Sequence, residues 1–188
     1  MIIRRYGSAD CEDLEKLTFA RAKTENVEEM LAIIRRCMDE VNRKDYAPHE
    51  FEKYLSHFTA EWLADIIKTR HYYEVRCEGK IIGCGGVSRD YSKEKQSYFT
   101  AIFINPDYHG KGIGKRFVRF LENDEWCLQS NLIEIPASKT ACEFYRKCGY
   151  EYRTFPPVFS DADGSTIMYK EVLGLNHHLN HSRQKTNI

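Results

Sequence analysis

A glycine-rich turn lies between an apolar run and an amphipathic segment of this sequence, and it strongly restricts the possible folds. Residues 96–104 are rich in aromatic and β-branched side chains, which predicts a buried strand. Residues 109–115 read His-Gly-Lys-Gly-Ile-Gly-Lys, and apolar residues at helical spacing follow as far as Asp124. The sequence therefore predicts a strand, a tight turn and a helix in direct succession, as in proteins that combine helices with a sheet.

The predicted turn has the properties of an anion site. The first N–H groups of a helix have no partner within the helix, and the helix dipole adds roughly half a positive charge there. Lys111 and Lys115 add charge, and the glycines let the backbone approach a ligand closely. We expect a cradle for a phosphate or pyrophosphate. It is not a P-loop, because His109 replaces the first glycine and Arg116 replaces the Ser or Thr, and the glycine spacing also excludes G-x-G-x-x-G.

Periodicity along the rest of the chain predicts further strands and helices. The expected strands are 18–23, 72–77, 81–88, 132–137, 150–153 and 166–171, and the expected helices are 26–42, 49–68 with a break before Thr59, 112–124 and 140–148. Asn26 and Glu29 form a capping-box pattern at the start of the first helix. The strand–helix–strand unit at 96–137 should supply a parallel pair. We therefore expect an α/β (α+β) fold with a mixed, mostly antiparallel central sheet flanked by helices.

The chain of 188 residues fits one domain, which we place at 18–171. Residues 1–17 nearly repeat the pattern of the segment that follows and are interpreted as an accessory strand–helix extension, although chance similarity remains an alternative. Residues 172–188 are polar and aperiodic and are predicted to be a disordered tail.

Charge and hydropathy exclude several kinds of partner. Lys and Arg together number 28, as do Asp and Glu, so no overall positive field favours nucleic acid. No apolar run approaches the ~20 residues that span a bilayer, and the N-terminus lacks a signal-peptide pattern. The seven cysteines include no C-x-x-C pair, which predicts reduced thiols and a cytoplasmic location.

No metal site is expected. His177, His178 and His181 fall in the polar tail, where ligands would lack a fixed arrangement. Asp161 and Asp163 lack the later Glu of a calcium loop, so they are interpreted as turn residues.

Two segments resemble the signatures of the GNAT superfamily of N-acetyltransferases. The stretch 101–114, Ala-Ile-Phe-Ile-Asn-Pro-Asp-Tyr-His-Gly-Lys-Gly-Ile-Gly, is similar to the family's acetyl-CoA motif, with His109 where Gln or Arg is usual. The stretch 133–150 is similar to a second signature, A-x-x-F/L-Y-x-x-x-G-F/Y. The resemblance covers residues 18–171 and implies a GNAT-like acyl-CoA N-acyltransferase fold.

The resemblance also implies site residues. Acetyl-CoA would be the cosubstrate, without a metal, bound by Ile102, Phe103, Ile104, His109, Gly110, Lys111, Gly112, Ile113, Gly114, Lys115 and Ser138. Tyr145 would protonate the departing thiolate, and Glu134 would remove the proton of the amine through water. Strand alternation predicts that Glu134 faces away from the side of Ile133 and Ile135, and His49, Glu50, Glu52 and His57 remain alternative bases.

By the same resemblance the chain would be an N-acetyltransferase that works by direct transfer in a ternary complex. The acceptor would be a small-molecule or protein amine, in a pocket built from about 43–60 and 154–165, with neither nucleic acid nor membrane as a partner. Homodimers are common in such folds. The alternative is a non-catalytic acyl-CoA-binding or sensor module, which would need the glycine turn but neither Tyr145 nor a base.

Overall fold

The computed structural model describes residues 16–89, 93, 95–161 and 163–172. The predicted extension at 1–17 and the predicted tail at 172–188 lie almost entirely outside this part of the chain. Strands are β1 (Leu17–Arg21), β2 (His71–Cys77), β3 (Lys80–Arg89), β4 (Gln96–Ile104), β5 (Leu132–Ser138), β6 (Glu151–Tyr152) and β7 (Ser165–Glu171). Helices are α1 (Val27–Cys37), α2 (Pro48–Leu55), α3 (Ala60–Thr69), α4 (Ile113–Glu122), α5 (Glu125–Leu128) and α6 (Lys139–Lys147).

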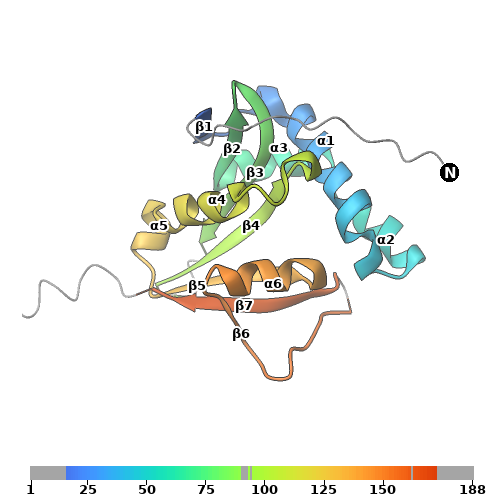
Figure 1. The fold of residues 1–188 in the computed structure, drawn as a ribbon, viewed down its shortest axis with the longest axis vertical. Coiled ribbons are helices and arrows are strands. Elements are labelled where there is room, and N and C mark those ends of the chain that lie inside the picture. Colours follow the sequence, from blue (N-terminus) through green and yellow to red (C-terminus); the bar gives the residue numbers. More distant parts are fainter. Residues whose placement is uncertain (1–15, 90–92, 94, 162, 173–188) are drawn as a thin grey trace, which may run out of the picture.

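The described strands form one seven-stranded sheet in the order β1-β2-β3-β4-β5-β7-β6 (Figure 1). β4 and β5 are parallel, and every other neighbouring pair is antiparallel. The parallel pair results from the connection through α4, because a return to the same direction requires a crossover. The mixed, mostly antiparallel sheet expected from the sequence is therefore confirmed.

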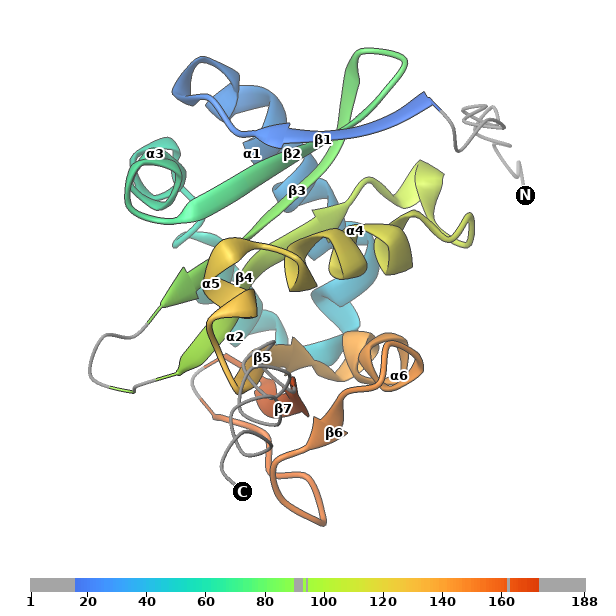
Figure 2. The same cartoon turned by 90° about the vertical axis from the view of Figure 1, so that its left-hand side faces the viewer.

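Helices cover both faces of the sheet (Figures 1 and 2). On one face, buried side chains of α4 and α6, such as Phe117 and Tyr145, pack with Ile133 and Ile135 of β5. On the other face, buried residues of α1, α2 and α3 pack with Tyr72 of β2. The chain thus has two apolar layers separated by the sheet.

The start of α3 and the end of α6 lie where single residues of the sequence predicted them. Thr59 caps α3, its Oγ1 accepting a hydrogen bond of 3.2 Å from the backbone N–H of Trp62. Gly149, at φ 90°, follows the end of α6. Such left-handed residues end helices readily when they are glycine.

Two expectations from the sequence are wrong. Asn26 does not cap α1 with its side chain; its Nδ2 instead donates a hydrogen bond of 2.6 Å to Glu74 on β2. The fold brings the Glu74 carboxylate close to Asn26, and the Asn26 side chain binds it instead of capping the helix. The prediction of seven reduced thiols fails at Cys77, which is disulfide-bonded, whereas Cys37, Cys84, Cys127, Cys142 and Cys148 are free.

Candidate active site

The central feature of the site is the separation of β4 from β5. Gln96, Ser97 and Tyr98 pair with Leu132, Ile133 and Glu134, and the two strands then diverge (Figure 1). The side of β4 that faces β5 therefore lacks a strand partner over residues 99–104. Because backbone N–H and C=O groups require hydrogen-bond partners, this stretch offers a row of them to a ligand. A cavity of about 1000 Å³ lies here, lined by residues of both strands.

The cavity wall on β4 contains a β-bulge. Cys84 pairs with Phe103 and Gly86 with Thr100, so Gly85 alone faces both Ala101 and Ile102. Ala101 has φ 48°, and its carbonyl oxygen accepts a hydrogen bond of 2.9 Å from the buried hydroxyl of Tyr72. A bulge redirects the backbone locally. The Tyr72 bond thus helps to hold the redirected segment in place.

The glycine turn forms the next wall. Gly112 is the N-cap of α4 at φ 79°, and no side chain caps the helix. Gly110 has φ 76°, and a Cβ at either glycine would meet nothing within 4 Å. The glycines are therefore needed for their backbone conformation, and the space in front of the helix N-terminus is open. This arrangement suits an anionic ligand, which the uncapped N–H groups and the helix dipole would favour.

The predicted residues of the turn lie where the motif suggested, with one exception. His109, Gly110, Gly112, Ile113, Gly114 and Lys115 line the cavity, as do Ile102, Phe103, Ile104 and Ser138. Lys111 is not among the lining residues; its Nζ lies 5.5 Å from the centre of the Tyr108 ring. Lys111 therefore contributes charge near the turn rather than a wall of the cavity.

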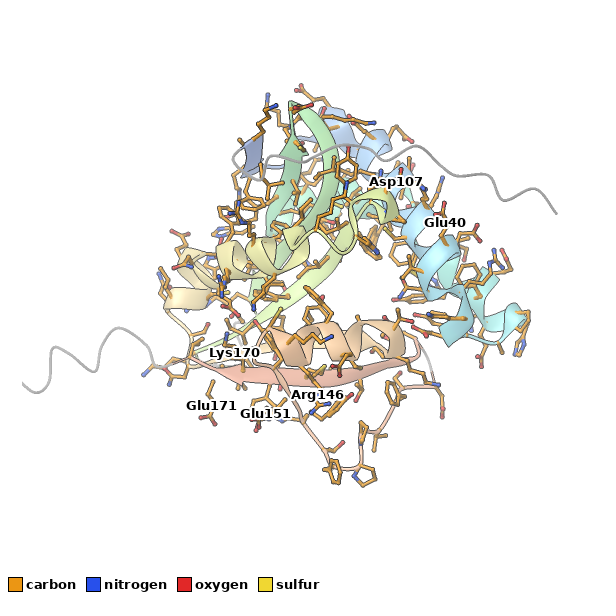
Figure 3. All side chains as sticks on the ribbon, in the orientation of Figure 1. Glu40, Asp107, Arg146, Glu151, Lys170 and Glu171 are labelled. Carbon is orange, nitrogen blue, oxygen red and sulfur yellow. The ribbon has the colours of Figure 1, made fainter. Side chains whose placement is uncertain are left out.

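The turn is anchored from both sides. Arg36 of α1 donates hydrogen bonds of 2.7 Å to each carboxylate oxygen of Asp107, and it also bonds Glu40, which Figure 3 labels together with Asp107. The guanidinium lowers the pKa of Asp107 through this bond. His109 directs its Nε2 to the carbonyl oxygen of Ile104 at 2.6 Å. The imidazole thus fastens the turn to the end of β4, which is a bracing contact.

Tyr145 lies on α6 and lines the cavity with 5% of its surface exposed. Its ring contacts Phe144 edge-on, with the ring centres 4.9 Å apart. Burial raises the pKa of the phenol above its ordinary value. The hydroxyl therefore stays protonated at neutral pH, as a proton donor must.

The structure does not bring Glu134 into the cavity. Its carboxylate lies 2.8 Å from Arg153 and accepts a hydrogen bond from Gln96. Glu134 is not a lining residue, and neither are His49, Glu50, Glu52 and His57. The predicted strand alternation is present, because Ile133 and Ile135 belong to the core on the α4 and α6 face. The arrangement gives no support for Glu134 as a base.

The far end of the cavity is built from residues that the sequence did not single out as ligands. Tyr46, Tyr54, Phe58 and Trp62 line it, and Asp163 lies in the turn before β7. Tyr46, Tyr54 and Phe58 fall in the segment 43–60, and Asp163 falls in the segment 154–165, the two segments expected to form an acceptor pocket. Trp62 lies just outside them. The sequence alone indicates only a turn at Asp163. Its place in the cavity depends on contacts between distant segments, which no local pattern records.

In the part of the chain that the structure describes, no helix is both long enough and apolar enough to cross a membrane. Over the same ranges, no three His, Cys, Asp or Glu side chains are grouped so as to hold a metal ion.

Comparison with known proteins gave a family match. Residues 27–150 match the family model described as Acetyltransferase (GNAT) family. A search of curated proteins gave no match.

Solved structures share the fold. A PaiA N-acetyltransferase from Thermoplasma acidophilum in complex with coenzyme A is 15% identical, with TM-score 0.69 over 83% of this chain and 99% of that one. An acetyltransferase of the GNAT family from Streptococcus pneumoniae is 17% identical, with TM-score 0.62 over 83% of this chain and 99% of that one. N-acetylglutamate synthase from Neisseria gonorrhoeae, complexed with coenzyme A and L-arginine, is 11% identical, with TM-score 0.60 over 84% of this chain and 33% of that one.

Proposed function

The chain belongs to the acetyltransferase (GNAT) family, and from this premise we propose that it moves the acetyl group of acetyl-CoA directly to a primary amine. The observation that carries the proposal is that one cavity is lined both by the open N-terminus of a helix and by a buried phenol. Gly112 and Lys115 line one part of it and Tyr145 another. An enzyme of this kind needs both a phosphate anchor and a group that acts on the sulfur.

The glycine turn would hold the pyrophosphate of the cosubstrate. Support comes from the left-handed Gly110 and Gly112, the uncapped start of α4 and the nearby Lys115. The unpartnered side of β4 at residues 99–104 would bind the amide groups of the pantetheine arm, since an extended chain can pair with a strand that lacks a neighbour. This placement directs the thioester toward the region between β4 and β5.

The proposed reaction needs two proton movements. The amine nitrogen, once neutral, attacks the thioester carbon, and negative charge develops on the carbonyl oxygen. Backbone N–H groups near the bulge at Ala101 would stabilise that charge. As the carbon–sulfur bond breaks, the Tyr145 hydroxyl would donate its proton to the thiolate. Because Glu134 is bonded to Arg153 and Gln96, we do not assign it the removal of the amine proton. That proton would pass to solvent water, and solvent would return a proton to Tyr145 after the thiol has left.

Replacement of Tyr145 by Phe tests the proposal. We expect kcat to fall by roughly 10²-fold, which is the lower range for general acid catalysis, because the thiolate would leave unprotonated. The dissociation constant of acetyl-CoA, measured by titration calorimetry, should change little, since the ring remains in place. A non-catalytic sensor would show no acetylation of any amine in either protein.

The matched control is Tyr169→Phe. Tyr169 lies on β7, does not line the cavity, and contacts Arg153 through its ring, 5.6 Å from the guanidinium carbon to the ring centre. This variant should retain the wild-type kcat. Equal losses of turnover and of acetyl-CoA affinity in Tyr145→Phe would argue against an acid role.

A further inference from the structure

The cavity is chemically divided. Its basic side chains, Lys115, Lys147 and His109, lie on α4, α6 and the glycine turn. A second set of lining residues, here called the amine half, comes from residues 46–62 and from the turn before β7: Tyr46, Tyr54, Phe58, Trp62 and Asp163. Among the described lining residues, no lysine, arginine or histidine belongs to the amine half. An anionic ligand would therefore find its counter-charges at one end only.

The aromatic side chains of the amine half form a continuous wall. The rings of Tyr46 and Tyr54 stack with centres 5.3 Å apart, and Tyr54 meets Phe58 edge-on at 5.4 Å. Phe58 in turn contacts Trp62 at 5.1 Å and Phe103 of β4 at 6.0 Å. Aromatic faces bury apolar groups and attract cations. The wall thus continues from the proposed thioester position on β4 into the amine half.

Asp163 supplies a negative charge against this wall. Its Oδ1 accepts hydrogen bonds from the backbone N–H and the hydroxyl of Ser165, at 3.1 and 2.8 Å, which fix the carboxylate. The neighbouring Gly164 lies against the Tyr46 ring, where an added Cβ would come within 3.1 Å. No described lysine or arginine forms an ion pair with Asp163. A fixed carboxylate on the wall of a cavity, without an ion pair to a described lysine or arginine, suits a cationic ligand.

Two tyrosines respond to this charge. Burial first, and then the Asp163 carboxylate, raise the pKa of Tyr54. Burial also raises the pKa of Tyr46, with further contributions from Tyr54 and Asp163. Both phenols are therefore neutral at physiological pH and present hydroxyl groups, not charges, to a ligand.

From these contacts we infer that the acceptor is a primary amine on an apolar or aromatic body without a carboxylate, and that Asp163 with the aromatic wall selects it. The inference rests on the proposed acetyl transfer. An amine arriving as an ammonium ion is attracted by Asp163 and by the rings. A carboxylate on the same molecule would be repelled by Asp163 and would lose hydration against the aromatic wall. α-Amino acids are therefore excluded as preferred acceptors.

Two matched pairs of compounds test the inference: 2-phenylethylamine with phenylalanine, and tryptamine with tryptophan. Within each pair the members differ only by the α-carboxylate. Acetylated product would be quantified by mass spectrometry at saturating acetyl-CoA, and binding of acetyl-CoA would be followed separately by calorimetry. We expect kcat/KM to be at least about tenfold higher for the member without the carboxylate, as for a lost charged contact.

Asp163→Asn provides the second arm. This nearly isosteric change keeps an acceptor oxygen for Ser165 but removes the charge, so KM for 2-phenylethylamine should rise about tenfold while acetyl-CoA affinity is unchanged. Asp161→Asn is the matched control, because Asp161 is exposed in the same turn and does not line the cavity. It should behave like wild type.

The outcomes separate the two claims. Three results would overturn the inference and leave the transferase function standing. They are equal or better turnover of the amino acids, an unchanged KM for 2-phenylethylamine in Asp163→Asn, and a loss in that variant that is confined to kcat. Acetyl-CoA binding without acetylation of any amine would overturn the transferase proposal and the inference together.

Discussion

At the scale of single residues, the surroundings of Tyr145 oppose its ionisation. The phenol is 5% exposed, and burial raises its pKa above the ordinary value of 10.0. A group with a raised pKa keeps its proton over a wider range of pH. The proposed acid is therefore in its active form throughout the range in which amines lose their protons.

This environment predicts the pH dependence of the reaction. The acceptor must be neutral to attack, so kcat/KM should rise with pH toward the pKa of the amine, and Tyr145 should cause no decline below about pH 10. The measurement is a pH profile of kcat/KM from about pH 6 to pH 10 for wild type and Tyr145→Phe. A descending limb between pH 8 and about 10 that vanishes in the variant would contradict the raised pKa.

Single residues also show that sequence patterns predict positions better than contacts between distant segments. Two signatures in the expected order pointed to Tyr145, which lines the cavity, and its role as an acid stays a proposal. Strand alternation correctly predicted the face of the sheet on which Glu134 lies. Its ion-pair partner Arg153 follows α6 in the sequence, and no residue spacing predicts that the two side chains meet. Asp163 is likewise an ordinary turn residue until the fold brings Tyr46 and Tyr54 beside it.

At the scale of elements, the glycine turn and α4 act as one unit. Gly112 sits at φ 79° directly before the first helical residue, and Gly114 lies under Phe144, where a Cβ would come within 3.1 Å. The first glycine permits the turn, and the second permits the close approach of α4 and α6. Both conditions must hold for the helix N-terminus to face the cavity.

Gly112→Val tests the unit. A β-branched residue at this positive φ is strained and covers the helix N-terminus, so acetyl-CoA binding should fall below detection by calorimetry. Gly79→Val is the control, since Gly79 has φ 80°, equally open space, and a place in the hairpin turn between β2 and β3. We expect both variants to lose similar amounts of thermal stability. Only Gly112→Val should lose affinity for acetyl-CoA. Unchanged affinity in Gly112→Val would refute the cradle.

Elements were more predictable than their contacts. The strand 96–104 was predicted with the bounds that β4 has, because aromatic and β-branched residues end there at an Asn-Pro turn. The four-residue α5 was missed, since it starts from a cap by Asp124 and is too short to show a period. The capping box at Asn26 failed because Glu74, from a distant strand, competed successfully for the side chain.

At the scale of the whole molecule, the sheet consists of two parts joined at a short seam. Only three residue pairs connect β4 with β5, and the cavity occupies the space beyond them. Two further contacts connect the segment between α1 and α2 with the junction of β5 and α6. Asn42 donates a hydrogen bond of 2.9 Å to Ser138, and Asp45 accepts bonds of 2.9 and 2.7 Å from the backbone N–H and the hydroxyl of Thr140.

The substitution Asp45→Ala tests how much the bonds between Asp45 and Thr140 stabilise the fold. Asp45 bonds the start of α6 from a distant segment, so its loss should lower the free energy of unfolding by about 1–2 kcal/mol in urea titrations, as loss of a helix cap does. Asp39→Ala is the control, because Asp39 is exposed and pairs with Arg43 one turn along the helix, which is worth no more than about 0.5 kcal/mol. Equal effects of the two substitutions would show that Asp45 makes no special connection.

The divergence of β4 from β5 has a consequence for solubility. An unpaired strand flank is normally a template on which other chains can add and aggregate. Here that flank lines the cavity, residues 100–103 being half-buried, and the Asn42–Ser138 and Asp45–Thr140 bonds tie the segment before α2 to the β5–α6 junction. In the proposed complex, the extended pantetheine arm would take the place of the missing strand and occupy the edge on which another chain could otherwise add.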